Sequence, residues 1–539
     1  MPDWLNNAVF YEIYPQSFYD SNGDGIGDIQ GITEKLDYIG ELGCNAIWIN
    51  PCFDSPFKDA GYDVRDYKKV APRYGCNEDL YNLFDEAHKR NMHVILDLVP
   101  GHTSEEHEWF TESKKTKPDE KYKNRYIWTD SWFCWSLDGL KFIAGEAERD
   151  GCYIINFFKC QPALNYGFLE QREKWQLPPD HPDCIAAREA LKDIMRFWLK
   201  RGCDGFRVDM ADSLVKYDDE HKSATSALWR SVRKMLDSEF PQAVLVSEWG
   251  SPVQAIKAGF HADFLLDHRD SGYKSLVRNY DSDTVNTGNS YFKKEGNGSI
   301  KKFLDQYLPW YESTKENGYI SIISGNHDTP RLSYHLDTDE TVLALALFFT
   351  FPGIPFLYYG DEIGMRYLNH LPTKEGGYSR TGSRTPMQWS AGNNAGFSST
   401  ASDQLYLPVD TEKDLINVQA QEKDSSSLLN KVKALLRLRN SEEDLKSKPN
   451  LEILYAAGCF AGSAEEGKPQ PEQTALNRSF IYKRGSCIIG VNPGGNEEKI
   501  PIAANGEPVL LYSTGECVFK NGILKLGSQS FGVWKESLP

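Results

Sequence analysis

Short apolar runs recur along the chain, and a longer amphipathic stretch follows most of them. The runs are rich in β-branched and aromatic residues, which is typical of buried strands. We expect eight strands, at residues 9–18, 46–51, 93–100, 205–209, 244–249, 262–266, 319–324 and 354–359. Between the first two, Ile32, Leu36, Ile39 and Leu42 share one helical face, and residues 80–90 repeat this pattern. Eight strands alternating with helices predict an α/β fold, a closed (β/α)8 TIM barrel.

Two segments depart from this alternation. Residues 102–167 are too many for a simple loop after the third strand, and their Trp- and Lys-rich composition indicates an inserted lid domain. After an amphipathic stretch at 428–438, short strands such as 480–483 and 486–491 are separated by turn sequences like PGGN. We therefore predict a barrel from 1–101 and 168–449, a lid (B) domain at 102–167, and a C-terminal antiparallel β-sandwich domain at 450–539.

Composition and charge restrict the function. The 539 residues include 40% apolar and 25% charged residues, as in folded globular proteins, and the net charge is −17. This charge disfavours nucleic acid and anionic membrane as partners and suits a neutral ligand such as a small oligosaccharide. No apolar run is long enough to span a membrane, and the N-terminus lacks the pattern of a secretory signal. The eleven scattered cysteines favour reduced thiols and a cytoplasmic location, and we expect a monomer or weak homo-oligomer.

Four strand-end segments contain an unusual density of carboxylates, His and Arg. They are DLVPGHTS (97–104), DGFRVDM (204–210), VSEWG (246–250) and SGNHDTP (324–330). A single Asp at a strand end is more often a helix cap or a solvated loop group than a catalyst. Four such segments change this balance, because the carboxyl ends of barrel strands converge on one site.

The carboxylates in these segments suit the cleavage of a glycosidic bond. This reaction needs one ionised carboxylate beside the reacting carbon and one protonated carboxyl beside the leaving oxygen, and we assign these to Asp209 and Glu248. Arg207 lies two residues before Asp209, so both side chains leave a strand on the same side and the guanidinium can keep the carboxylate ionised. Asp328, His327 and His102 are expected to hydrogen-bond sugar hydroxyls. Either histidine alone would more often be a buried core residue.

These segments, with QPALN (161–165), SRTPMQW (383–389) and the opening FYEIYPQSFYDSNGDGIGD, resemble the α-amylase superfamily (glycoside hydrolase family 13). The resemblance is to its oligo-1,6-glucosidase, α-glucosidase and trehalulose-synthase-like branch. It implies a covalent glucosyl-enzyme on Asp209, Glu248 as acid/base, and Asp328 as a third carboxylate that stabilises the transition state. Arg207, His102 and His327 would surround them.

A further match concerns the mode of action. In KDAGYDVRDY, Asp59 occupies the position that, in exo-acting relatives, binds the terminal glucose opposite an arginine matching Arg384. Tyr62 resembles the platform that stacks beneath that sugar. The alternative is that Asp59 is a loop residue and Arg384 an ordinary ion-pair partner.

The segment DSNGDGIGD offers oxygen ligands at alternating positions, as in a calcium loop: Asp20, Asn22, Asp24, the Ile26 carbonyl and Asp28. Gly31 stands where an EF-hand has its bidentate Glu, so the loop is not an EF-hand, but it resembles the family's small calcium loop. We expect this loop to bind a structural Ca²⁺ ion. Mg²⁺ is the alternative ion, and the other alternative is a turn that binds no ion.

Three positions depart from the family pattern. Gly101 replaces an Asn that many amylases use near calcium, which argues against a second ion at the junction of barrel and lid. Ala163 replaces a common Asp, and Met210 follows Asp209 where relatives have Val, Thr or Ala, so linkage preference stays open.

We therefore expect a retaining, exo-acting α-glucosidase. A glucosyltransferase or a sucrose or trehalose isomerase would use the same intermediate, and the sequence separates these poorly. A non-catalytic transporter-associated barrel would lack the carboxylates and carry a membrane span, and an unrelated barrel enzyme would make the motifs a coincidence.

Overall fold

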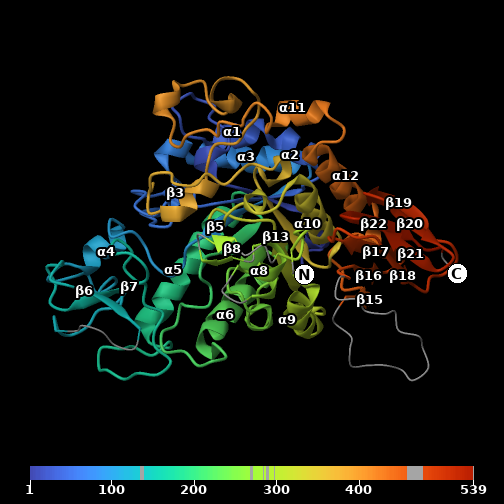
Figure 1. Ribbon diagram of the computed structural model, residues 1–539. Coiled ribbons are helices and arrows are strands. Elements are labelled where there is room, and N and C mark those ends of the chain that lie inside the picture. Colours follow the sequence, from blue (N-terminus) through green and yellow to red (C-terminus); the bar gives the residue numbers. More distant parts are fainter. Residues whose placement is uncertain are drawn as a thin grey trace.

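A computed structural model (Figure 1) describes residues 1–133, 139–267, 271–278, 280–282, 285–286, 290–296, 298–457 and 477–537. Its centre is a closed barrel with strand order β1-β14-β13-β10-β9-β8-β5-β2, and all neighbouring strands are parallel. The strands are β1 (Phe10–Ile13), β2 (Ala46–Ile49), β5 (His93–Leu98), β8 (Gly205–Val208), β9 (Val244–Ser247), β10 (Ala262–Phe264), β13 (Tyr319–Ile323) and β14 (Ile354–Tyr358). The predicted TIM barrel is confirmed.

Each of the eight predicted strands is a barrel strand, but each is shorter than predicted. The largest difference is in the first, which ends at Ile13 instead of Phe18. Pro15 begins a 3-10 turn, Pro15–Ser17, because proline lacks the amide hydrogen that a strand would donate.

Helices surround the barrel (Figure 1). They are α1 (Ile29–Glu34), α2 (Leu36–Leu42), α3 (Asn77–Lys89), α5 (Pro182–Leu199), α6 (Ser223–Glu239), α7 (Pro252–Lys257), α8 (Gly272–Val277), α9 (Ile300–Thr314), α10 (Thr338–Thr350), α11 (Val418–Lys423) and α12 (Leu428–Ser441). The helical face predicted at 32–42 is buried as expected, but it spans two helices. Lys35 separates them with φ −105° and ψ 7°, and its ammonium lies 3.9 Å from the centroid of the Tyr19 ring. No described helix is long and apolar enough to cross a membrane.

Aromatic side chains fill the barrel interior. Phe10 stacks on Phe356 with ring centroids 4.3 Å apart, and Phe264 lies edge-on to Phe356 at 4.9 Å. Trp48 stacks on Phe264 at 5.5 Å, and the Arg207 guanidinium lies 5.1 Å from the Trp48 ring centroid. The charged side chain of Arg207 therefore packs against an aromatic layer inside the barrel.

Two excursions leave the barrel after β2 and β5. The first contains the short pair β3 (Phe53–Asp54) and β4 (Asp66–Val70). The second contains α4 (Glu108–Ser113) and the antiparallel pair β6 (Lys141–Ala144) and β7 (Cys152–Ile155), and it projects from one side of the barrel (Figure 1). Residues 134–138 of the predicted lid lie outside the described residues, and its boundaries stay a prediction.

The C-terminal region is antiparallel, as predicted. It forms a five-stranded sheet (β15-β16-β17-β22-β19) and a three-stranded sheet (β18-β21-β20). The strands are β15 (Leu451–Ala456), β16 (Phe480–Arg484), β17 (Cys487–Asn492), β18 (Glu498–Pro501), β19 (Val509–Thr514), β20 (Cys517–Lys520), β21 (Ile523–Leu526) and β22 (Ser530–Lys535). Hydroxyls of Thr350 in α10 and Tyr482 in β16, 2.6 Å apart, join the sheet to the barrel helices. Residues 458–476 and 538–539 of the predicted domain lie outside the described residues.

Candidate active site

The predicted catalytic residues lie together at the carboxyl ends of the barrel strands. Asp209 directly follows β8, Glu248 directly follows β9, and Asp328 lies shortly after β13. The amide of Asp209 donates to the Leu98 carbonyl (2.9 Å) and that of Glu248 to the Val208 carbonyl (2.9 Å). These bonds extend the barrel ladder by one residue, so rigid backbone positions both carboxylates.

The guanidinium of Arg207 is the centre of this group. Its Nη1 lies 2.9 Å from Asp97 Oδ1 and 3.1 Å from Asp209 Oδ1, and its Nη2 lies 2.8 Å from Glu248 Oε2. The side chain of Arg207 is 2% exposed, whereas those of Asp209 and Glu248 are 12% and 16% exposed. The predicted contact between Arg207 and Asp209 is present, and the same cation also holds the proposed acid.

Three carboxylates around one cation leave excess negative charge. Burial raises the pKa of Asp209 well above the ordinary range, Glu248 raises it further, and Arg207 opposes both effects. Burial also raises the pKa of Asp97 to about 6. The expectation that Arg207 simply keeps Asp209 ionised was therefore incomplete, because Arg207 divides its charge among three partners.

Glu248 has a second fixed contact. The amide of Met210 donates to Glu248 Oε2 at 3.1 Å, and Met210 has φ 42°, a left-handed conformation that is uncommon for residues other than glycine. This conformation turns the chain directly after Asp209 and aims an N–H at the neighbouring carboxylate.

Asp328 has a different environment, with two arginines beside it. Its Oδ1 lies 2.8 Å from Arg384 Nη2 and 3.0 Å from Arg380 Nη1. Burial would raise the pKa of Asp328, but the positive charges of Arg384 and Arg380 outweigh burial and hold this pKa well below the ordinary range. Its side chain is 33% exposed, so Asp328 is an ionised group that can reach a ligand.

The two predicted histidines have protein partners, and His327 Nε2 also lies 3.4 Å from Asp328 Oδ2. His327 is fully buried, with Nε2 2.7 Å from the Tyr62 hydroxyl and Nδ1 3.1 Å from Glu12 Oε1. His102 Nε2 lies 3.0 Å from the Tyr62 carbonyl, and Nδ1 lies 3.1 Å from Asn156 Nδ2. Burial lowers the pKa of His327 to about 3 and that of His102 to about 4, so both rings are neutral. Their contacts with sugar hydroxyls stay a prediction.

Asp59 has an ion-pair contact with Arg380, and the predicted roles of Asp59 and Arg384 on opposite sides of a terminal glucose stay a prediction. Arg384 binds Asp328 and donates to the His327 carbonyl (2.8 Å), while Arg380 Nη2 lies 3.7 Å from Asp59 Oδ1. Gln161 Nε2 donates to Asp59 Oδ2 at 2.7 Å. Arg380 therefore stands between Asp59 and Asp328.

Sequence reasoning missed four polar members of this site: Glu12, Asp97, Gln161 and Arg380. Asp97 and Gln161 lie inside segments that were singled out, DLVPGHTS and QPALN, so strand-end position was an available signal for Asp97. Arg380 lies four residues before Arg384 in a 3-10 segment, Tyr378–Ser383, and no local pattern distinguishes it from a surface arginine.

The predicted metal ligands form a tight loop before α1. Asp20 accepts hydrogen bonds from the amides of Gly23 (2.7 Å) and Gly25 (2.8 Å). Asp28 caps α1 by accepting from the Gly31 amide, and Asn22 and Asp24 accept from the amides two residues further on. The carboxylates therefore point at the loop's own amides and do not converge on one point.

Comparison with known proteins decides the family. The model of the alpha-amylase catalytic domain matches residues 12–448. The chain belongs to the α-amylase family.

Relatives in this family act on several glucosides. The trehalose synthase/amylase TreS of Mycolicibacterium smegmatis is 34% identical over 527 residues, covering 90% of this chain and 82% of that protein. The glucan 1,6-alpha-glucosidase of Streptococcus pneumoniae is 32% identical over 564 residues, covering 95% of each. A mutant isomaltulose synthase from Erwinia rhapontici, solved with D-glucose, has the same fold, with a TM-score of 0.77, 24% identity and full coverage of both chains. This α-amylase family member is an enzyme acting on glucosides.

Proposed function

We propose that this enzyme is a retaining, exo-acting α-glucosidase that removes terminal glucose from short oligosaccharides. The observation that carries the proposal is the contact of one buried guanidinium, that of Arg207, with both Asp209 and Glu248. A retaining mechanism needs its two carboxyl groups about 5–5.5 Å apart, and two carboxylates on one guanidinium are close neighbours.

In the first step, Glu248 gives its proton to the glycosidic oxygen while Asp209 attacks the anomeric carbon. The bond to the leaving sugar breaks, and an ester between glucose and Asp209 forms. Arg207 and the Met210 amide engage Oε2 of Glu248, so Oε1 is the oxygen that carries the proton. In the second step, Glu248 takes a proton from water, and the resulting attack releases α-glucose and restores both carboxyl groups.

Asp328 supplies negative charge beside the positively charged transition state. Arg380 and Arg384 keep Asp328 ionised and fix its position, so its orientation does not have to change during the reaction. Exo action is supported by the contacts of Asp59 with Gln161 and Arg380, which hold it as an acceptor for hydroxyls of the terminal sugar.

The alternative is transfer of the same intermediate to a sugar acceptor, as in a glucosyltransferase or a sucrose or trehalose isomerase. The similarity to the trehalose synthase/amylase favours this alternative, and that to the glucan 1,6-alpha-glucosidase favours hydrolysis.

The experiment that separates them is incubation with maltose, isomaltose, sucrose, trehalose and maltoheptaose, followed by anomer-sensitive NMR. Early α-glucose from the short substrates, absent with Asp209→Asn, supports the exo-acting hydrolase and identifies the linkage. Rearranged disaccharides with little free glucose assign the enzyme to the isomerases. Internal cleavage of maltoheptaose contradicts exo action.

We also propose that the loop from Asp20 to Asp28 binds Ca²⁺. Three carboxylates, one amide oxygen and one carbonyl are the oxygen ligands that Ca²⁺ prefers, and binding requires their side chains to turn away from the loop amides. The ion would hold the loop rigid and take no part in proton transfer. Added Ca²⁺ should raise the melting temperature of the chelator-treated enzyme more than that of Asp24→Asn; an equal shift would contradict the site.

A calcium ion at the junction of barrel and lid is not proposed. The ammonium of Lys216 lies 3.3 Å from Asn156 Oδ1, and a side chain on Gly101 would meet Asn156 Nδ2. This fixed cation repels a second one.

The location proposed for the enzyme is the cytoplasm. Its support is that the nine cysteines among the described residues are free thiols, as is usual in a reducing compartment. Cys134 and Cys459 lie outside the described residues.

A further inference from the structure

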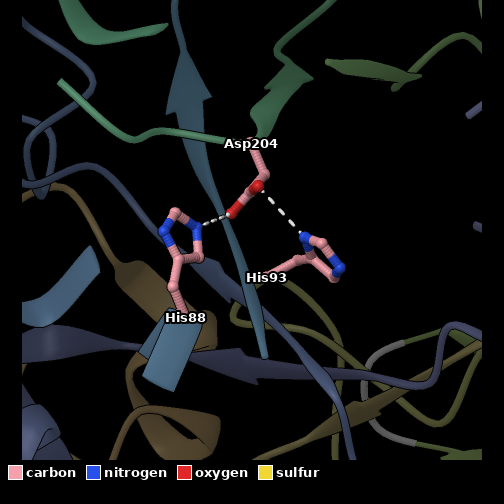
Figure 2. A group of neighbouring side chains, drawn as sticks. All are labelled: His88, His93 and Asp204. Atoms are coloured by element: carbon pink, nitrogen blue, oxygen red, sulfur yellow. Dashed lines mark hydrogen bonds and ion pairs between the residues drawn. The ribbon is translucent and has the colours of Figure 1, made fainter. Parts of the chain in front are cut away.

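Two histidines and an aspartate, drawn in Figure 2, lie close together. Their elements place them at the amino-terminal end of the barrel strands, opposite the proposed catalytic carboxylates. His93 is the first residue of β5, Asp204 directly precedes β8, and His88 is in the last turn of α3. The proposed catalytic groups lie at the other ends of these strands, so this cluster is separate from the active site.

Figure 2 shows the Asp204 carboxylate between the two imidazoles. His88 Nε2 lies 2.9 Å from Asp204 Oδ2, and His93 Nδ1 lies 3.0 Å from Asp204 Oδ1. One atom from each of the three side chains lies within 4.8 Å of the others. Asp204 contacts each imidazole with a different oxygen.

We propose that His88, His93 and Asp204 bind a divalent transition metal of the zinc class. Two imidazoles and one carboxylate are common ligands for Zn²⁺, Co²⁺ and Ni²⁺, whereas Ca²⁺ and Mg²⁺ prefer sites made only of oxygen. The three residues supply three of the four tetrahedral positions, and water can supply the fourth.

Metal binding requires adjustment of both imidazoles, whose ligand atoms lie within 4.8 Å of each other. Bonds of 2.0–2.2 Å from Zn²⁺ to nitrogen and oxygen place tetrahedral ligand atoms about 3.3 Å apart. The present separations from Asp204 to His88 and His93 are 2.9 and 3.0 Å, so each imidazole has to move outward by a few tenths of an ångström. On metal binding, the proton on each ligating nitrogen moves to the other ring nitrogen or leaves to solvent.

The surroundings position the ligands and leave them accessible. The His93 ring stacks on the Trp4 indole, with centroids 4.0 Å apart and an interplanar angle of 14°. Asp204 accepts a hydrogen bond from the Val94 amide (2.8 Å), which fixes the carboxylate. The side chains of His88, His93 and Asp204 are 39%, 27% and 16% exposed, so an ion can reach all three from solvent.

A bound ion would tie α3, β5 and β8 together at the base of the barrel. Because the site exists only in the folded chain, metal binding stabilises the fold by an amount that grows with the logarithm of the metal concentration above the dissociation constant. This proposal does not rest on the proposed glucosidase activity, and its test measures metal uptake.

The test is titration of the full, chelator-treated chain with Zn²⁺ against a chromophoric competitor, with visible absorption of Co²⁺ to report tetrahedral coordination. We expect one tight equivalent, weakened at least about tenfold in His88→Gln and separately in His93→Gln, together with loss of the Co²⁺ band. If one variant fails to fold, the other carries the test. The rise in melting temperature with Zn²⁺ should disappear with the same substitutions.

Two control variants address other ligands on the surface. His221→Gln removes an exposed histidine beside Glu220, and Cys76→Ser removes an exposed thiol. Both should bind Zn²⁺ as the parent chain does. Uptake that survives both cluster substitutions, uptake that is lost in Cys76→Ser, or no tight uptake at all would overturn the proposal.

Discussion

The guanidinium of Arg207 lies 2.9 Å from the Asp97 carboxylate, and both side chains are almost completely buried. Arg207→Gln would leave Asp97, Asp209 and Glu248 without a cation. Removing one partner of a buried ion pair costs about 3–5 kcal/mol, because the remaining charge stays desolvated. We expect a loss of this size in the free energy of unfolding at pH 7, measured with denaturant.

The loss should shrink as the pH falls, because protonation neutralises the carboxylates that lack a partner. The double variant with Asp97→Asn should recover part of the stability. An unchanged free energy of unfolding in Arg207→Gln would show that the carboxylates do not depend on this cation.

The fold could be predicted from the sequence because all eight barrel strands are short apolar runs with helices between them. Strand ends were overestimated where a local breaker such as Pro15 stops pairing before the apolar run ends. Helix ends were hard to predict for the same reason. The apolar face continues from α1 into α2, although Lys35 between them is not helical.

The site could be predicted only where the sequence links residues to strand ends. Asp209, Glu248 and Asp328 follow strands directly or closely, so barrel geometry brings them together. Arg380 could not be predicted in this way, because its position beside Asp59 and Asp328 depends on the path of a long loop. The sharing of Arg207 among three carboxylates likewise depends on tertiary distances.

Glu248→Gln should separate substrates by their leaving groups. Loss of a general acid costs about 10²–10⁴-fold in rate when the leaving oxygen needs a proton. We expect a loss in this range in kcat/KM for maltose or isomaltose. The loss in kcat/KM for α-glucosyl fluoride should be far smaller, because its leaving group needs no proton, while its kcat should fall because the second step has lost its base. Steady-state kinetics measure both, with the exposed Glu220→Gln as a control. Equal losses for both substrate types would remove Glu248 from the acid role.

Glu248→Gln should also lower the pKa of Asp209. Burial and the Glu248 carboxylate both raise this pKa, and the substitution removes the second contribution. Attack by Asp209 requires its ionised form. The acid limb of the pH profile of kcat/KM for α-glucosyl fluoride should therefore move to lower pH in the variant. A limb that stays in place or moves to higher pH would show that the two groups titrate independently.

Gly205 allows β8 to begin close to β9. It has φ 151°, and a Cβ there would lie 2.3 Å from the Val244 carbonyl oxygen. Gly205→Ala should destabilise the fold by roughly 1–3 kcal/mol. Gly40→Ala is the matched control, because Gly40 lies in α2 and its added Cβ would meet nothing within 4 Å beyond its own helix backbone and chain neighbours. This substitution should stabilise the fold by roughly 0.4–1 kcal/mol. Denaturant unfolding measures both, and a destabilised control or a neutral Gly205→Ala would contradict the argument.

The most direct test of the mechanism is to trap the covalent intermediate on Asp209. 5-Fluoro-α-glucosyl fluoride suits this purpose, because its fluoride leaves readily while the second fluorine slows release of the glucosyl group. Peptide mapping by mass spectrometry should place the fluoroglucosyl group on the peptide that contains Asp209, and Asp209→Asn should give no adduct. A label on another carboxylate, or β-glucose as the first product from a natural substrate, would contradict the double displacement on Asp209.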